Sequence, residues 1–197
     1  PFLEDRDIIL FDQRGIGFSS ALPDMSYESF QILAADASPE EELQLTRALI
    51  ETYKDKCRVL GMHPEYYNTD QNARDVGMLF EHLGYEKYIL YGGSYGTRLA
   101  RVVQDLFPGF VHSTVLDSPS PLSGDFLLNR LDSYSLALSR IFEYCDASPE
   151  CSEKYPDLKS DYFNAISSLG DSPVEVVLND SIPFVINQQD GIYLLRR

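Results

Sequence analysis

One serine stands in the sequence setting in which nucleophilic chemistry is expected. Ser94 is the centre of Gly-Gly-Ser-Tyr-Gly at positions 92–96, which fits the pattern G-x-S-x-G. A short apolar run at 88–91 precedes it, and apolar residues at helical spacing follow it. A strand, a tight glycine turn and a helix are the context of a nucleophile elbow, where a strained backbone holds the serine hydroxyl clear. The sequence therefore predicts Ser94 as the nucleophile of an acyl transfer.

The neighbours of Ser94 have residue types that suit such a turn. We expect Gly92, Gly93 and Gly96 to form the elbow, with Gly92 and Gly96 relieving crowding between strand and helix. The backbone N–H of Tyr95 can point at a developing oxyanion, with help from the helix dipole. The alternative is an ordinary glycine-rich turn between a strand and a helix, because the bare pattern is weak.

The histidines provide no base in a usable place. Hydrolases with such an elbow order the triad along the chain as Ser, then Asp or Glu, then His. His63 and His82 precede Ser94, and His112 begins the next expected strand, at the end away from the elbow if the sheet is parallel. We therefore expect the triad acid and histidine to lie outside this chain. A serine without a base is a weak nucleophile, so the chain alone is expected to be inactive.

Asp117 is the candidate acid within the chain. It ends the strand that follows the elbow, at the carboxyl edge of the sheet where catalytic groups gather. The favoured alternative is that Asp117 braces its loop by accepting backbone N–H groups, since no histidine is available for it to orient.

The spacing of apolar residues predicts strands that alternate with helices. Strands are expected at 7–11, 88–91 and 111–116, and helices at 38–56, from about 70 to 84, and after the elbow to 106. Residues 21–37 are expected to be irregular and 61–67 to form a loop. A capping box at 38–41 begins the first helix, and Asn68 to Asp70 can cap the second. Such alternation implies a parallel α/β sheet.

The remaining sequence has a different pattern. Helices are expected at 127–142 and 158–169, and a hairpin at 174–186. These elements suggest an inserted cap, which divides the chain into a core at 1–121 and a cap at 122–197. Asp12 and Arg14, in the turn after the first strand, are expected to brace that turn.

Composition excludes several classes of partner. The 197 residues carry a net charge of -15, with 31 acidic and 16 basic side chains, which argues against nucleic acid and anionic membranes. No apolar run approaches the roughly 20 residues of a membrane span. No cofactor is expected, and the Cys and His spacing does not suit zinc. The sequence does not begin with Met, so we expect its N-terminus to be missing.

The three cysteines give a weak indication of the cellular compartment in which the protein resides. Cys145 and Cys151 lie six apart and can close a short disulfide loop, which leaves Cys57 without a partner in this chain. A disulfide favours a secreted or periplasmic protein, whereas three unlinked thiols would fit the cytosol.

Taken together, the motifs resemble the α/β-hydrolase fold, nearest to its prolyl aminopeptidase and tripeptidyl aminopeptidase branch. The matching pieces are, in order, 12–19, 67–69 with 72–75, 83–84, 92–96 and 115–117, and the segment 145–151 resembles the cap of the tripeptidyl branch. The resemblance implies a parallel-sheet α/β core, incomplete here, with a mostly helical cap insertion. It also implies a His-Gly-Gly-Pro-Gly loop before residue 12 for the second oxyanion donor, which this sequence lacks.

The resemblance further implies a serine hydrolase that removes residues from peptide N-termini through an acyl-enzyme. Carboxylates of the cap would bind the substrate ammonium group. An esterase or lipase-like hydrolase on the same scaffold, with an ester in place of a small peptide as substrate, is one alternative. A binding module that kept the fold and lost the triad is the other.

Overall fold

The computed structural model describes residues 4–179 and 181–195, and the chain forms two compact units. The first comprises Pro1–Pro23 and Tyr53–Ser123, and the second comprises Asp24–Thr52 and Gly124–Arg197. The division into a core and a cap at residue 121 stays a prediction.

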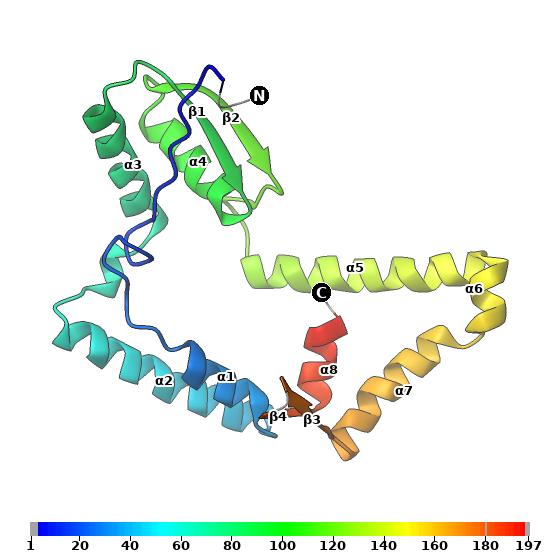
Figure 1. Ribbon diagram of the computed structural model, residues 1–197. Coiled ribbons are helices and arrows are strands. Elements are labelled where there is room, and N and C mark those ends of the chain that lie inside the picture. The colour runs from blue at the N-terminus through cyan, green and yellow to red at the C-terminus, as the bar shows by residue number, and fades with distance from the viewer. Residues whose placement is uncertain (1–3, 180, 196–197) are drawn as a thin grey trace. The chain divides into compact units, whose positions relative to one another are not determined.

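The first unit contains a parallel β-α-β arrangement. Strands β1 (Tyr88–Gly93) and β2 (Val111–Asp117) pair in parallel, and helix α4 (Tyr95–Leu106) connects them (Figure 1). Their register ends with Gly93 opposite Asp117. This pairing confirms the parallel α/β character that the sequence predicted, and it brings the carboxyl ends of both strands together beside the start of α4.

The core of this unit lies between α3 (Thr69–Leu83), α4 and β1. The Phe80 ring stacks on the Tyr88 ring with centroids 4.0 Å apart, and the Tyr88 hydroxyl donates to the Phe80 carbonyl at 2.8 Å. Burying a large apolar side chain contributes about 1.5–3 kcal/mol, so this cluster fixes both helices against the strand. Its buried members are Ala73, Val76, Phe80, Tyr88, Leu99 and Val103.

The ends of α3 follow the predicted signals. The Asn68 side chain accepts from the Gln71 N–H at 3.0 Å at the N-terminus. Gly84 ends the helix with a left-handed φ of 73°. The predicted loop before this helix contains one short 3-10 turn, η1 (Pro64–Tyr66).

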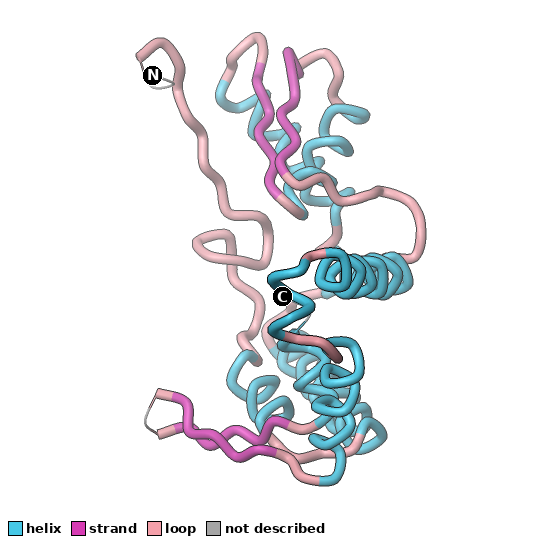
Figure 2. Tube along the Cα trace, turned by 90° about the vertical axis from the view of Figure 1, so that its right-hand side faces the viewer, coloured by secondary structure: helices cyan, strands magenta, loops and turns pink. Residues whose placement is uncertain are grey.

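The expectation of a strand at 7–11 is wrong. Residues 7–11 form a loop, in which Ile8 and Leu10 are 55% and 90% exposed (Figure 2). The composition of this run suits a strand, but a strand needs a neighbour, and in the described chain β1 and β2 pair only with each other. The 111–116 segment does form β2, yet most of its residues are exposed and none is buried.

The second unit begins with a helix that the sequence analysis missed. Residues 21–37 were expected to be irregular, but α1 covers Ser26–Ala34. The Asp24 carboxylate accepts from the Ser26 N–H at 2.8 Å, and the Phe30 ring packs on Phe184 of β4 with centroids 6.0 Å apart. A turn at its start and a ring contact between residues far apart in sequence therefore stabilise this helix. Helix α2 (Pro39–Val59) begins at the predicted capping box, in which the Ser38 N–H donates to Glu41 at 2.9 Å.

Helices and one hairpin make up the rest of this unit. The hairpin β3 (Val174–Leu178) and β4 (Ile182–Ile186) is antiparallel, as predicted. The helices are α5 (Phe126–Ala147), α6 (Pro149–Lys154), α7 (Leu158–Asp171) and α8 (Gln188–Leu195), of which α6 and α8 were not foreseen.

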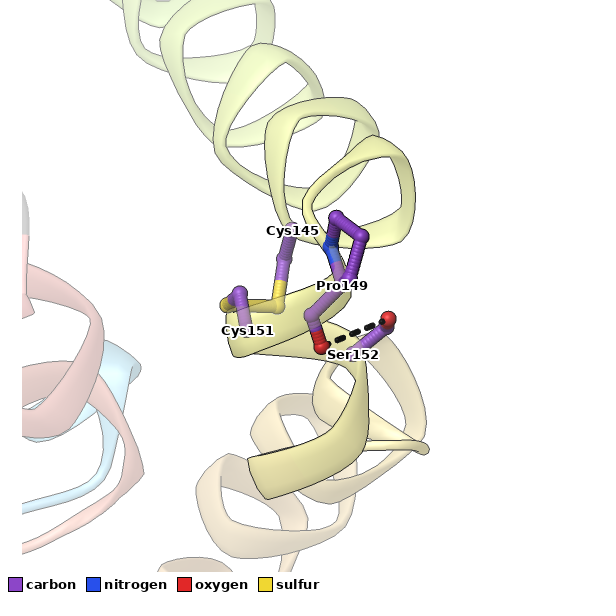
Figure 3. The surroundings of a disulfide bond; sticks show 4 residues. All are labelled: Cys145, Pro149, Cys151 and Ser152. Carbon is purple, nitrogen blue, oxygen red and sulfur yellow. Dashed lines mark hydrogen bonds between the residues drawn. A yellow bond between two sulfur atoms is a disulfide. The ribbon is translucent and has the colours of Figure 1, made fainter.

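A disulfide joins Cys145 of α5 to Cys151 of α6. The Cα atoms of these cysteines lie 5.0 Å apart, and the Ser152 hydroxyl donates to the Pro149 carbonyl beside them at 3.4 Å (Figure 3). The structure thus forms the pair that the sequence predicted, and Cys57 is buried and free.

Candidate active site

The predicted nucleophile Ser94 has an unusual backbone conformation. It lies between the last residue of β1 and the first residue of α4, with φ 49° and ψ -117°. Holding a serine in such a sparsely populated region costs about 1–3 kcal/mol. Ser94 is exposed, and its side chain does not cap α4. The hydroxyl is therefore accessible on a sharp strand-to-helix turn.

Three backbone and side-chain hydrogen bonds hold this turn in place. The Ser94 N–H donates to the Asp117 carbonyl at 2.9 Å, which ties the elbow to the end of β2. The Ser94 carbonyl accepts from the Thr97 N–H at 3.0 Å and from the Thr97 hydroxyl at 2.6 Å. Sequence reasoning missed Thr97, which is fully buried and also accepts from the Ser120 N–H at 2.8 Å. The sequence signal for Thr97 was a hydroxyl residue in the first helical turn after the G-x-S-x-G motif.

Gly92 allows strand and helix to approach each other. A Cβ on Gly92 would overlap the Gly96 carbonyl group and would lie 2.9 Å from the Thr97 nitrogen. A Cβ on Gly96 or Gly93 would meet no atom within 4 Å. The expectation that Gly92 relieves crowding is confirmed, whereas for Gly96 it is wrong, because the Gly96 backbone itself is the crowding partner.

Tyr95, the predicted oxyanion donor, is the first residue of α4. The first N–H groups of an α-helix have no partner inside the helix, and the helix dipole makes that end positive. The arrangement can therefore donate a backbone hydrogen bond to an anion beside Ser94. The Tyr95 side chain reaches α3, where its hydroxyl lies 2.9 Å from the Thr69 hydroxyl.

Asp117 braces the elbow from the end of β2. Its carboxylate accepts from the Tyr91 hydroxyl at 2.8 Å and from the Ser118 hydroxyl at 3.1 Å. The hydrogen bond and the charge of Asp117 raise the pKa of Tyr91. The sequence suggested backbone N–H donors for this bracing role, and the structure supplies hydroxyl donors.

The three histidines lie away from this carboxylate. His112 is five residues before Asp117 in β2, so the strand separates them by about 16 Å. His63 is exposed with its Nδ1 3.3 Å from Glu65, and His82 is exposed near the end of α3. Within residues 4–179 and 181–195, no histidine forms a hydrogen bond with Ser94. That the general base for Ser94 lies outside this chain stays a prediction.

Asp12 and Arg14 brace the turn at 12–19, as predicted. The Asp12 carboxylate accepts from the Phe18 N–H at 2.8 Å. The Arg14 guanidinium donates twice to Asp75 of α3, at 2.7 and 2.6 Å, and this pairing raises the pKa of Arg14. These bonds fix the turn to α3.

A polar cavity of about 260 Å³ lies between the 12–19 turn and α3. Asn72 lines it and is 8% exposed, with its Oδ1 atom buried and without a partner among the described residues. Its other lining residues are Phe11, Asp12, Gln13, Arg14, Ser19, Ser20 and Asp75.

Two further features, a metal-binding cluster and a membrane-spanning helix, are absent from the described ranges. No group of three or more His, Cys, Asp or Glu side chains gathers there in a way that could hold a metal ion. No helix in these ranges has both the length and the hydropathy needed to cross a membrane.

Comparison with known proteins places this chain in a family. The profile of the alpha/beta hydrolase fold matches residues 1–153. The chain belongs to the α/β hydrolase fold family. Its short parallel strand pair and surrounding helices are an incomplete version of that α/β core.

Two curated proteins of this family resemble the chain in sequence. Both are named tripeptidyl aminopeptidase, one from Streptomyces lividans and one from Streptomyces coelicolor. Each is 34% identical over 118 residues, which is 57% of this chain and 22% or 21% of the relative. The chain thus spans about a fifth of the length of these relatives. No solved structure matches it significantly.

Proposed function

We propose that the full-length protein is a serine hydrolase, an aminopeptidase that cleaves residues from peptide N-termini. The observation that carries the proposal is the backbone of Ser94, a strained, exposed serine between a parallel strand and a helix. Membership of the α/β hydrolase family supports hydrolysis, and the names of the two relatives support a peptide substrate.

In this proposal Ser94 Oγ attacks the scissile carbonyl carbon, and the Tyr95 N–H donates to the oxyanion of the tetrahedral intermediate. The intermediate collapses by breaking the C–N bond, the rest of the peptide leaves as an amine with the proton taken from Ser94, and the acyl-enzyme remains. Water then hydrolyses the ester, which releases the acyl group as a carboxylic acid and returns a proton to Ser94. The base that takes the Ser94 proton belongs to a part of the protein outside this chain, as does the second oxyanion donor. Carboxylates of the cap at 122–197 bind the ammonium group of the peptide.

Ester hydrolysis is the second candidate, because the same elbow serves acyl transfer from esters and amides. The position of the histidines instead favours the non-catalytic binding module. Each candidate predicts a different substrate profile, so one set of assays separates them.

The test is the substitution Ser94→Ala in the full-length protein. We expect it to preserve folding and to lower kcat for tripeptide anilides by about 10⁴–10⁶-fold, by analogy with other serine hydrolases. Ser113→Ala, in an exposed serine of β2, is the matched control and should leave kcat unchanged. Full activity of Ser94→Ala would end the proposal. A wild-type protein that hydrolyses only short acyl esters would support the esterase, and one that hydrolyses neither would support the binding module.

A further inference from the structure

The side chain of Tyr95 is anchored at its far end. Its hydroxyl lies 2.9 Å from the Thr69 hydroxyl at the start of α3 and accepts from Asn72 Nδ2 at 3.5 Å. Tyr95 as a whole is 41% exposed, so burial alone does not hold its side chain. Polar contacts with α3 therefore determine where this side chain lies.

Asn72 links this anchor to a second element of the same unit. Its Nδ2 group donates to Gln13 Oε1 at 2.8 Å, in the turn that Asp12 and Arg14 brace. A carboxamide NH₂ has two protons, so one can serve Gln13 while the other serves the Tyr95 hydroxyl. That hydroxyl accepts from Asn72 and also forms a hydrogen bond with the Thr69 hydroxyl, in which either oxygen can be the donor. The side chains of Gln13, Asn72, Tyr95 and Thr69 form one continuous chain, which we call the Tyr95 anchor.

The anchor acts on the residue whose backbone N–H faces the reaction. Tyr95 directly follows Ser94, whose positive φ makes the sharp bend into α4. Ser94 does not cap the helix, so its hydroxyl does nothing to fix the direction of the first N–H groups. Fixing the Tyr95 ring at α3 restricts the first residue of α4. An oxyanion donor must lie about 2.7–3.1 Å from the oxygen, and small misplacements cost large factors in rate.

We propose that the Tyr95 anchor positions the backbone N–H of Tyr95 for oxyanion stabilisation. This inference rests on the proposed function, because it assigns Tyr95 N–H to the oxyanion formed at Ser94. Thr69, Asn72 and Gln13 act through the Tyr95 side chain and are therefore positioning residues in this proposal. A purely structural role for the same hydrogen bonds would change stability and leave the balance between kcat and KM unaltered.

The central experiment is Tyr95→Phe in the full-length protein, which keeps the ring and removes the hydroxyl. For hydrolysis of a tripeptide anilide we expect kcat to fall about 5- to 30-fold with KM changed less than twofold, the effect of one hydrogen bond used in the transition state. Inhibition by a peptide aldehyde, which forms a tetrahedral adduct, should weaken by a similar factor. The matched control is Tyr27→Phe, which removes an exposed hydroxyl that accepts from Gln31 of its own helix, its one hydrogen-bond partner among the described residues. This variant should change neither constant.

A second pair of variants tests the anchor at Thr69, so that the result does not depend on whether the Tyr95→Phe protein folds correctly. Thr69→Val has nearly the same shape and removes the hydroxyl, so it should lower kcat as Tyr95→Phe does, while Thr69→Ser should restore most of the lost rate. The double variant Tyr95→Phe/Thr69→Val should be no slower than either single variant, because both break the same chain.

The two proposals fail in different ways. Labelling of Ser94 by a fluorophosphonate in the wild-type protein, together with unchanged kcat in Tyr95→Phe and Thr69→Val, would overturn the anchor and leave the proposed function intact. Loss of stability in both variants with unchanged kcat would also overturn it. An absence of Ser94 labelling in an active wild-type protein would overturn both proposals.

Discussion

The backbone of Ser94 links the sequence motif to its chemistry. Its φ of 49° is costly for a residue with a Cβ, so the surrounding structure must stabilise it. The carbonyl of Asp117 and the buried hydroxyl of Thr97 do so from β2 and α4. Gly92 contributes by having no side chain where the helix backbone passes. The strained backbone of Ser94 is thus held in place by contacts with β2 and α4.

Gly92→Ala tests this account of the elbow. The new Cβ would overlap the Gly96 carbonyl, and backbone atoms must move to relieve the overlap, so we expect a loss of about 1–3 kcal/mol in the free energy of unfolding. Activity should fall with it, because the displaced backbone carries Ser94. Urea denaturation of the full-length protein measures the loss. Gly109→Ala, where a Cβ meets no atom within 4 Å, is the control. Equal stability of the two variants would contradict the crowding argument.

At the scale of elements, signals within a few residues of sequence predicted the helices and strands that local interactions stabilise. Helix α3 begins and ends at its predicted caps, and the β1–elbow–α4 segment lies where the apolar run and the glycines indicated. Residues 7–11 were misjudged because an apolar run specifies a strand only when a partner strand is present. Helix α1 was missed because the contact of Phe30 with Phe184 joins residues far apart in sequence.

The candidate site was predictable to the same extent. The proposed nucleophile, the proposed oxyanion donor and the close approach at Gly92 all come from one motif. Thr97 was missed because its role depends on a fold-back to Ser120, and Asn72 because its partners come from two other elements. These contacts depend on tertiary packing, and only the hydroxyl at position 97 gave a short-range signal.

The disulfide between α5 and α6 gives a prediction at this scale. The disulfide closes a loop of only a few residues, so it removes little conformational entropy from the unfolded chain. We expect the double substitution Cys145→Ser/Cys151→Ser to lower the free energy of unfolding by at most about 2–3 kcal/mol, and a reductant to have the same effect on the wild type. Urea denaturation checks both. Mass spectrometry of non-reduced protein from an oxidising compartment should show the bond, and two free thiols there would refute it.

For the whole molecule, the decisive feature is that no histidine of the described residues is hydrogen-bonded to Ser94. His112 lies at the opposite end of β2 from Asp117, and His63 and His82 make no hydrogen bond with Ser94 in the part of the chain that the structure describes. General-base help contributes roughly 10²–10⁴-fold, so the isolated 197-residue chain should react slowly at Ser94. The full-length protein, which we propose supplies the acid, the histidine and the second oxyanion donor, should react fast.

Labelling with a fluorophosphonate, followed by mass spectrometry of the labelled peptide, tests the central claim that Ser94 is an activated nucleophile. The account predicts one rapid, stoichiometric adduct on Ser94 in the full-length protein and at most slow labelling of the isolated chain. A rapid adduct on another serine, with Ser94 unmodified, would contradict the assignment of the nucleophile. Rapid labelling of the isolated chain that His112→Ala abolishes would contradict the claim that the base lies outside it.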